Sequence, residues 1–277
     1  MDIVRWGLYG NIYTETYQHL SDGGPNCYND MTNTFRISIS TISAIICILV
    51  MQKCWAKIKT SQELSRAIGK KPNIFEYIVG LACWGTFAVQ TGYKLYTGRG
   101  VFMNNPCHIV LLMQGYVLLT KKHKFSAVIF ICQLRWLYGV FAALKFPVTT
   151  GMELPLEVEF FWIEHLLGAF AGPLALTLSG RFFFFEYKTF FVHQMFGWDS
   201  HVLYQRIYML PISLMTWANL NYMLCRPDHD PFVPYIGNWY YVFSEIYLNL
   251  VSIIAFTIVF TLTWILRKII RYKEKQD

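Results

Sequence analysis

The sequence predicts an all-α membrane protein, a seven-transmembrane helix bundle with its N-terminus lumenal and its C-terminus cytosolic. Of the 277 residues, 55% are hydrophobic and only 15% are charged, whereas soluble domains carry roughly 25% charged residues. Aromatic residues make up 18% of the chain, which is typical of side chains at membrane interfaces. Long apolar segments separated by short polar ones complete the pattern.

Seven segments are long enough to cross a hydrocarbon core of about 30 Å. They lie at 34–51, 74–96, 101–120, 125–143, 159–179, 202–225 and 241–266. Polar side chains interrupt the third, fourth and fifth segments. The chain therefore divides into a polar lumenal segment, a seven-span domain and a basic cytosolic tail, at 1–33, 34–266 and 267–277.

Lysine and arginine predict the orientation. With the N-terminus lumenal, 16 of these residues fall on the cytosolic side, five fall on the lumenal side and three lie within spans. Cytosolic loops of membrane proteins carry such an excess. The net charge of +7 is thus explained by membrane topology, and nucleic-acid binding is not expected.

The segment 181–201, which reads RFFFFEYKTFFVHQMFGWDSH, is too interrupted by polar residues to span comfortably. We expect an interfacial or re-entrant aromatic helix there. The alternative is a gate through which lipid reaches the bundle.

The chain has seven cysteines. Cys27 and Cys225 fall near the lumenal side, where an oxidising compartment would allow a disulfide between them; two unrelated thiols are the alternative. Cys47, Cys83 and Cys132 are expected to be small buried side chains. No Cys/His spacing indicates zinc, and neither a metal nor a cofactor is expected.

Polar side chains on five spans fall in one leaflet. Cys107 lies about 9 Å inside the third span at 1.5 Å per residue, and His165 lies at the same depth in the fifth. The others in this layer are Arg135, Asn219, Asn221, Glu245 and Asn249. Intramembrane polar groups indicate function, although the three asparagines are also explained by hydrogen bonds between helices.

A thiol needs a base, because the thiolate is the nucleophile. His108 is adjacent to Cys107 but is expected to point about 100° away on the helix. His165, on another helix at equal depth, is therefore the predicted base, and His108 would orient substrate or support the site.

Pro106 is expected to break the helix just before Cys107. Asn104 and Asn105 can supply amide donors to the freed carbonyl, and one of them can stabilise an oxyanion. Arg135 is expected either to hold a lipid phosphate or to pair with Glu164 or Glu245. Together these groups predict acyl transfer through a Cys107 thioester.

The runs NNPCHIVLLMQ and WIEHLLGAFAGPLAL resemble the transmembrane protein 164 family, and the resemblance extends over most of the chain. It implies a seven-span acyltransferase of the endoplasmic reticulum or Golgi, with Cys107 as nucleophile and His165 as catalytic histidine. The implied reaction moves a polyunsaturated chain from phosphatidylcholine to lyso-ether phosphatidylethanolamine without acyl-CoA. Its readily peroxidised product links the family to ferroptosis. A wider kinship to the androgen-induced protein group, hydrolases with a threonine in place of the cysteine, is also implied.

The main alternative function is a transporter or channel lined by His108, Arg135, Glu164 and Glu245. The apolar inner halves of the third, fifth and seventh spans argue against a crossing path and favour a one-sided cavity. The motifs of a seven-span receptor and the histidine set of a zinc ceramidase are missing. The expected partners are membrane phospholipids and lysophospholipids, with no obligatory protein partner.

Overall fold

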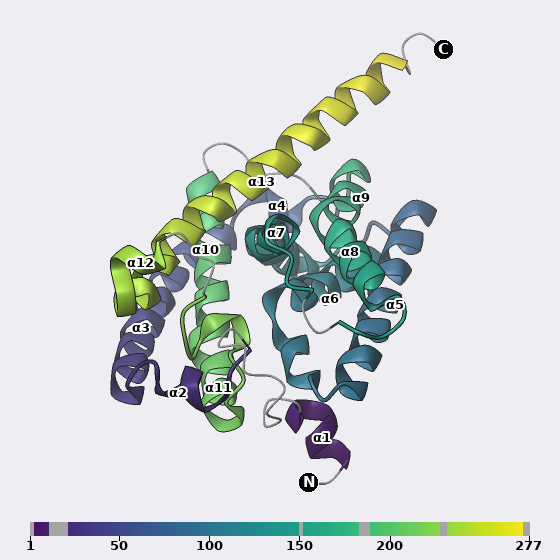
Figure 1. Cartoon of the computed structure of the whole chain (residues 1–277). Helices are drawn as coiled ribbons and strands as arrows, with labels where there is room; N and C mark the ends of the chain where they lie inside the picture. Colours follow the sequence, from purple (N-terminus) through teal and green to yellow (C-terminus); the bar gives the residue numbers. More distant parts are fainter. Residues whose placement is uncertain (1–2, 11–21, 150–151, 183–188, 228–231, 274–277) are drawn as a thin grey trace.

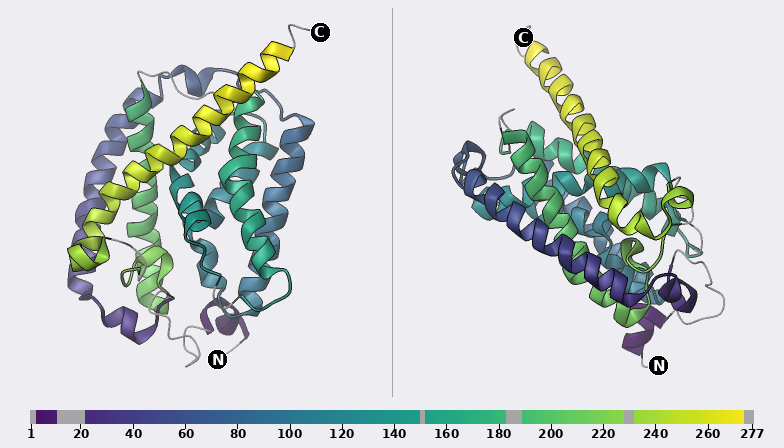
Figure 2. Two further views of the ribbon diagram at one scale, coloured as in Figure 1. Left: turned by 45° about the horizontal axis from the view of Figure 1, so that its top comes forward. Right: turned by 90° about the vertical axis from the view of Figure 1, so that its left-hand side faces the viewer.

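The computed structural model describes residues 3–10, 22–149, 152–182, 189–227 and 232–273. Within these residues all regular secondary structure is helical. The single β-type pairing is an isolated bridge between Gly23 and Ala218. The long helices form a bundle with α1 (Ile3–Tyr9) at one end and α4 (Gln62–Ser65) at the opposite end (Figures 1 and 2). The prediction of an all-α chain is confirmed. The predicted terminal segments lie partly outside the described residues, at 1–2, 11–21 and 274–277.

The first two long helices begin at side-chain caps. Thr32 Oγ1 accepts a hydrogen bond from Phe35 N–H (3.3 Å) at the start of α3 (Asn33–Ile58). At the start of α5 (Ile74–Tyr96), Asn73 and Glu76 each accept the other's backbone N–H, a reciprocal cap that fixes the first turn. The helix predicted at 74–96 thus has the bounds that the structure shows.

Two elements replace the predicted third span. The 3₁₀ helix η2 (Gly100–Asn104) is followed by an extended Asn105 (ψ 144°), and α6 (Pro106–Leu119) then begins. Pro106 occupies the first turn, where its missing N–H costs no hydrogen bond. The helix break therefore lies just before Cys107, as expected, but the proline opens a new helix instead of kinking one.

The next two rods follow their predicted ranges. α7 (Lys124–Lys145) contains the predicted fourth span. The fifth is a continuous run of α8 (Glu157–Leu166), the π-helical η3 (Leu167–Ala171) and α9 (Gly172–Leu178). The π-helical turn begins just after His165, and such turns occur frequently at functional sites.

The sixth rod corrects the sequence prediction. It consists of α10 (Phe190–Leu203), the π-helical η5 (Tyr204–Met209) and α11 (Leu210–Thr216), so the bounds predicted for the span at 202–225 are wrong at both ends. The chain after it turns irregularly, with positive φ at Trp217, Asn221 and Tyr222.

The prediction of an interfacial helix at 181–201 is also wrong from Phe190 onward. Residues 183–188 lie outside the described part of the chain. Four polar side chains of α10 are between 0% and 4% exposed: His193, Gln194, Asp199 and His201. These side chains face the interior of the bundle. The low hydropathy of this segment therefore does not mean that the segment lies in water.

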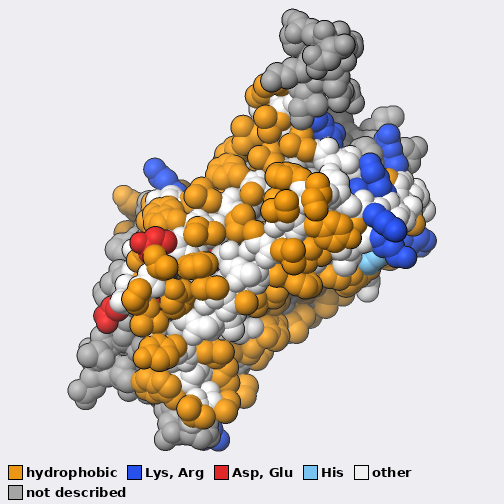
Figure 3. All heavy atoms as spheres, turned by 90° about the vertical axis from the view of Figure 1, so that its right-hand side faces the viewer, with side chains coloured by type: hydrophobic (Ala, Val, Ile, Leu, Met, Phe, Trp, Pro, Cys, Tyr) orange, Lys and Arg blue, Asp and Glu red, His pale blue; other side chains and the backbone are white. Residues whose placement is uncertain are grey.

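The last long helix, α13 (Tyr240–Lys273), crosses the bundle obliquely (Figure 2). It extends past the predicted span at 241–266. Along one side, Ile246, Leu250 and Ile254 are each more than half exposed. Hydrophobic side chains cover most of another face, with lysine and arginine gathered toward one end (Figure 3). Apolar surface of this extent indicates contact with lipid.

In the part of the chain that the structure describes, four helical runs are long and apolar enough to cross a membrane: α3, α7, Glu157–Leu178 and Val233–Ile269. α6 is apolar but shorter. The membrane character of the chain is therefore supported. Seven crossings and the side of each terminus remain predictions. The remaining short elements are α2 (Gly24–Asn29), η6 (Leu220–Tyr222), α12 (Val233–Ile236) and η7 (Gly237–Trp239).

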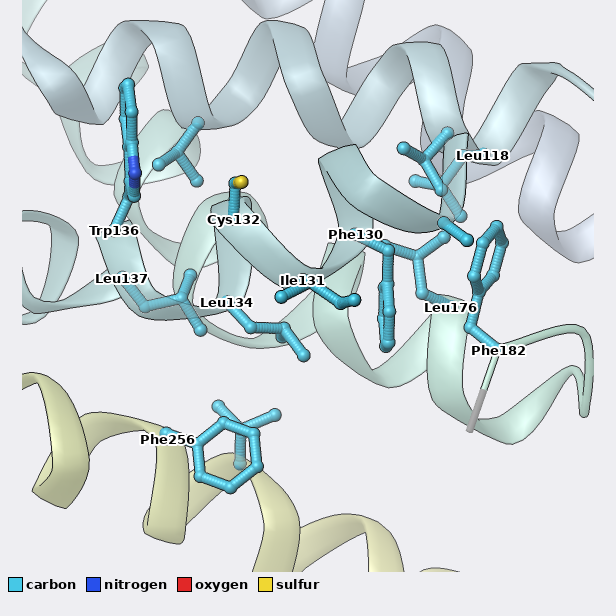
Figure 4. Packing of buried hydrophobic residues seen from close by; sticks show 14 of the residues in the cluster. Leu118, Phe130, Ile131, Cys132, Leu134, Trp136, Leu137, Leu176, Phe182 and Phe256 are labelled. Carbon is cyan, nitrogen blue, oxygen red and sulfur yellow. The ribbon is translucent and has the colours of Figure 1, made fainter. Parts of the chain in front are cut away.

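The hydrophobic core lies around α7, against which α6, α8, α10 and α13 pack. Figure 4 shows Phe256 of α13 facing Leu134 and Leu137 of α7. At the other end of the cluster the rings of Phe130 and Phe182 are stacked at 4.8 Å. This packing fixes α6 and α8, which carry the candidate site, on a rigid support.

One end of the bundle, which we term the disulfide end, is locked covalently. Cys27 of α2 and Cys225, the two cysteines for which the sequence allows a disulfide, are joined by one. The buried Arg36 donates hydrogen bonds from Nη2 to the carbonyls of Cys27 and Tyr28 (3.3 and 2.9 Å) and from Nε to that of Leu224 (3.0 Å). The disulfide and this arginine together hold the irregular segment after α11 against α2 and α3.

Reducing this disulfide is expected to lower the free energy of unfolding by about 2–5 kcal/mol, because the bond closes a long loop of the unfolded chain. Thermal unfolding in detergent with and without reductant measures the effect. The Cys27→Ser variant should unfold at the temperature of the reduced wild type and should not respond to reductant. An unchanged wild-type Tm under full reduction would contradict the expectation.

Candidate functional site

Cys107 lies in the first turn of α6 and is half-buried. The backbone N–H groups of Cys107 and His108 lie against its sulfur. The first N–H groups of a helix have no partner within the helix and present partial positive charge. The thiol therefore lies where the backbone can stabilise negative charge on sulfur or on an oxygen bonded nearby.

His108 and Glu164 form a buried pair beside this thiol. His108 Nδ1 is bonded to Glu164 Oε1, which joins α6 to α8. Ligand atoms of Cys107, His108 and Glu164 all lie within 4.8 Å of one another. The expectation that His108 points away from Cys107 is therefore wrong, because the bond to Glu164 holds its ring close to the sulfur.

His165 has one nitrogen anchored and one free. Its Nδ1 donates to the carbonyl of Phe161 (2.7 Å). A carbonyl only accepts, so the neutral ring carries its proton on Nδ1 and its lone pair on Nε2. Nε2 is buried and has no hydrogen-bond partner within the described residues. His165 interacts electrostatically with Glu164 and His108, which places it in the same cluster as the predicted nucleophile's neighbours.

The two asparagines before Pro106 are held differently. Asn104 Nδ2 donates to the carbonyl of Val101 (2.8 Å), which is the role predicted for an amide at the helix break. The hydroxyls of Tyr204 and Tyr208, from η5, donate to the backbone and side-chain oxygens of Asn104 (2.7 and 2.9 Å). The π-helical η5 thus holds in place, through two hydrogen bonds to Asn104, the segment that leads into Cys107.

Asn105 retains a donor. Its Oδ1 accepts from the backbone N–H of Asn221 (3.2 Å). No hydrogen bond within the described residues engages its Nδ2. Since Asn104 Nδ2 is already bonded to Val101, Asn105 is the amide that remains available for an oxyanion.

Sequence reasoning missed three neighbours of the thiol. Lys94 of α5, Tyr138 of α7 and Tyr204 of η5 all lie within electrostatic range of Cys107. Lys94 lies near the end of a predicted span, and the two tyrosines fall in apolar segments. No local pattern marks them, because they reach Cys107 only through the packing of separate helices.

The two carboxylates predicted as partners of Arg135 are bound by other side chains. Glu245 is paired with Arg206 (2.6 Å) and accepts a hydrogen bond from Ser43 (3.2 Å). Glu164 is bonded to His108. The predicted pairing of Arg135 with Glu164 or Glu245 is therefore wrong, because both carboxylates are taken.

Cys107, His108 and Glu164 could in principle donate one atom each to a metal ion. They are the one such group in the described part of the chain. A direct hydrogen bond already joins His108 and Glu164, and an ion would have to replace it. The geometry is explained by that bond without a metal.

Residues 31–263 match the TMEM164 family. The match covers far more than half of the 277 residues and includes every residue of the site described above. The chain belongs to the TMEM164 family. The resemblance seen in its sequence motifs is thereby confirmed, and the family name agrees with the membrane character of the helices.

The chain is also similar to a protein from Dictyostelium discoideum named "Transmembrane protein 164 homolog". The two are 28% identical over 187 residues, which is 67% of this chain and 64% of that protein. The similarity thus spans less than two thirds of the relative's own length. No solved structure matches the chain.

Proposed function

We propose that this TMEM164 family member is a membrane-embedded phospholipid acyltransferase that works through a thioester on Cys107. One observation carries the proposal. A half-buried thiol lies at the start of α6, beside the His108–Glu164 pair, and His165, the residue that follows Glu164, has a buried Nε2 without a hydrogen-bond partner within the described residues. A nucleophile, a base and oriented partners are the arrangement that acyl transfer needs.

In the first half-reaction the Cys107 thiol loses its proton to His165 Nε2, and the sulfur attacks the ester carbonyl of a donor phospholipid. A carbon–sulfur bond forms and the ester carbon–oxygen bond breaks. His165 returns the proton to the leaving oxygen, so that a lysophospholipid with a free hydroxyl departs. The acyl chain remains on Cys107 as a thioester.

In the second half-reaction the hydroxyl of another lysophospholipid attacks the thioester. His165 Nε2 takes the hydroxyl proton, a new ester bond forms, and the thiolate leaves and is reprotonated. No acyl-CoA, metal or other cofactor takes part in either half. Water acting in place of the second lipid would give hydrolysis.

Each half passes through a tetrahedral intermediate with a negative oxygen. The backbone N–H groups of His108 and Ile109 already donate to the carbonyl of Asn105 (3.0 and 3.3 Å). The backbone N–H of Cys107 and the Nδ2 of Asn105 are therefore the donors that would stabilise this negative oxygen. The tyrosines of η5 hold Asn104 and so fix the position of this loop.

We further propose that the acyl chain is polyunsaturated, that it comes from phosphatidylcholine and that it goes to lyso-ether phosphatidylethanolamine. The motifs around Cys107 and His165 and the family membership support this substrate choice. The disulfide end supports a lumenal position of that end in the endoplasmic reticulum or Golgi, because disulfides persist in oxidising compartments.

The thioester itself is the decisive test. Purified protein in lipid nanodiscs is incubated with phosphatidylcholine that carries a labelled arachidonoyl chain, and intact mass spectrometry follows the protein. Wild type should gain one acyl mass that hydroxylamine removes, and added lyso-ether phosphatidylethanolamine should discharge it into product. Cys107→Ala should gain none.

The matched control is Cys83→Ala, which removes a fully buried thiol on α5 and should acylate like wild type. Acylation of Cys107→Ala, or full restoration of ether lipids by this variant in cells that lack the protein, would overturn the proposal. A transporter lined by the buried His, Arg and Glu groups would then be the better function.

A further inference from the structure

Arg135 occupies the face of α7 that points toward α10 and α13, and its side chain is only 2% exposed. A Cβ atom added at Gly197 would lie 3.0 Å from the Cβ and Cγ atoms of Arg135. The absence of a side chain at Gly197 therefore makes room for the arginine. Its guanidinium carbon lies 4.3 Å from the centre of the Phe256 ring. Gln133, which bonds Gln114 of α6, lies on the opposite face of α7.

The charge of Arg135 has no counterion in the described part of the chain. Its Nε and Nη2 atoms are buried without a hydrogen-bond partner. The carboxylates proposed for it are taken by His108 and Arg206. Guanidinium stays protonated in proteins, so neutralisation does not relieve this burial.

The other buried arginines show what this one lacks. Arg36 donates to three backbone carbonyls and to Asn33, Arg181 binds Glu76 and three carbonyls, and Arg206 binds Glu245 and the carbonyl of Tyr241. An unpaired buried charge is strongly unfavourable. Arg99, which is also buried, and Arg206 each leave one Nη atom without a hydrogen-bond partner within the described residues, whereas Arg135 leaves both Nε and Nη2 open, which are two donors available for a ligand.

The donors of the neighbouring polar side chains are bonded to one another, while Gln194 Oε1 has no hydrogen-bond partner within the described residues. Gln194 Nε2 donates to Asn249 and Ser252 (2.9 and 3.2 Å), and Ser252 donates to the backbone carbonyl of Arg135 (2.7 Å). This network ties α10 and α13 to α7 beside the guanidinium. It leaves the Arg135 side chain as the donor that is open, and two parallel N–H groups fit two oxygens of an oxyanion.

The surroundings indicate that such an oxyanion belongs to a lipid. Phe256 of α13 covers one face of the guanidinium. The core side chains Ile131 and Leu134 lie on α7, the helix that carries Arg135. α13 crosses the bundle obliquely (Figure 2). Its side chains Leu250 and Ile254 are more than half exposed. A ligand that reaches Arg135 past this helix comes from the bilayer.

We propose that Arg135 is a binding site for the oxyanion of an amphipathic lipid, held between α7, α10 and α13. The shared chemistry is a phosphate or carboxylate group on an acyl chain. The site is separate from the thiol chemistry, because no hydrogen bond or ion pair within the described residues joins Arg135 to Cys107. It therefore stands or falls independently of the acyl-transfer proposal.

The sign of the change in Tm caused by Arg135→Met tests the proposal. Methionine keeps most of the length and removes the charge, so in an empty site it should raise the Tm of the detergent-purified protein by removing an unpaired charge. With a resident anion it should lower the Tm. Native mass spectrometry should then show about one bound lipid on wild type and roughly tenfold or more lower occupancy on the variant, as expected for lost charged hydrogen bonds.

Titrations of delipidated wild type identify the oxyanion. A Tm rise with phosphatidic acid alone assigns a phosphate, a rise with oleate alone assigns a carboxylate, and either supports the proposal. A rise with inorganic phosphate of the same size, or with uncharged monoacylglycerol, contradicts a lipid oxyanion. Arg135→Lys keeps the charge and should retain the response, and Arg226→Met, which alters a partly exposed pair, should retain it fully. A Tm of Arg135→Met above that of wild type with unchanged bound lipid would overturn the proposal.

Discussion

Replacing His165 by asparagine is expected to slow acyl transfer by about 10²- to 10⁴-fold, the usual contribution of a general acid–base. Asparagine keeps an N–H that can donate to the carbonyl of Phe161, the bond that now anchors His165 Nδ1. It offers no basic nitrogen in place of the free Nε2. Folding should therefore persist while proton transfer is lost. Initial rates in nanodiscs with labelled phosphatidylcholine measure the effect.

His123→Asn is the matched control. His123 caps α7, where its Nδ1 accepts from the Ser126 N–H (3.2 Å), and it lies beyond the end of α6 that is opposite to the thiol. Asparagine is a preferred N-cap residue, so this variant should keep at least half of the wild-type rate. If His165→Asn also kept half of the rate, His165 would not be the base, and His108 beside the sulfur would take its place in the mechanism.

Replacing Arg181 by methionine is expected to cost about 3–5 kcal/mol of unfolding free energy, because it leaves Glu76 as an unpaired buried charge. Arg181 is fully buried and binds Glu76 Oε1 (2.7 Å). It also donates to the backbone carbonyls of Thr120 and Val117 (2.6 and 2.9 Å). One side chain thus ties α5 to the end of α6. Denaturant unfolding in mixed micelles gives the free energy.

Two further variants separate charge from packing. Adding Glu76→Gln to Arg181→Met should recover part of the loss, since no lone carboxylate remains, although the freed carbonyls stay unpaired. Arg226→Met removes an ion pair with Asp30 at the surface and should cost at most about 1 kcal/mol. Equal losses for the Arg181 and Arg226 variants would show that the buried pair has no special weight.

The elements that the sequence predicted well are those that local chemistry determines. Asn73 and Glu76 signal the start of α5 through their capping positions, and Pro106 signals the break before α6. Apolar length predicted α7 and the run at 157–178 within a few residues. These features depend on residues close in sequence, and tertiary contacts do not alter them.

The sixth rod shows where this reasoning fails. Hydropathy assigns polar residues to water, but His193, Gln194, Asp199 and His201 are buried against neighbouring helices. Their burial is offset by contacts that come from distant segments, such as the hydrogen bond between His201 and Tyr138 (3.0 Å). An average of hydropathy along the sequence does not include those contacts. The span was therefore predicted too far toward the C-terminus, over residues that form an irregular loop.

The sequence by itself determined the membrane class and the family, and it predicted Cys107 and His165 as the candidate pair, because these depend on composition, on local motifs and on depth along a helix. Only the tertiary structure decided how polar side chains are paired. It brought His108 to Glu164, gave Glu245 to Arg206 and left Arg135 open. Each pairing joins residues on different helices, and a hydrogen bond or ion pair depends on distances of a few ångströms that spacing along one chain does not specify.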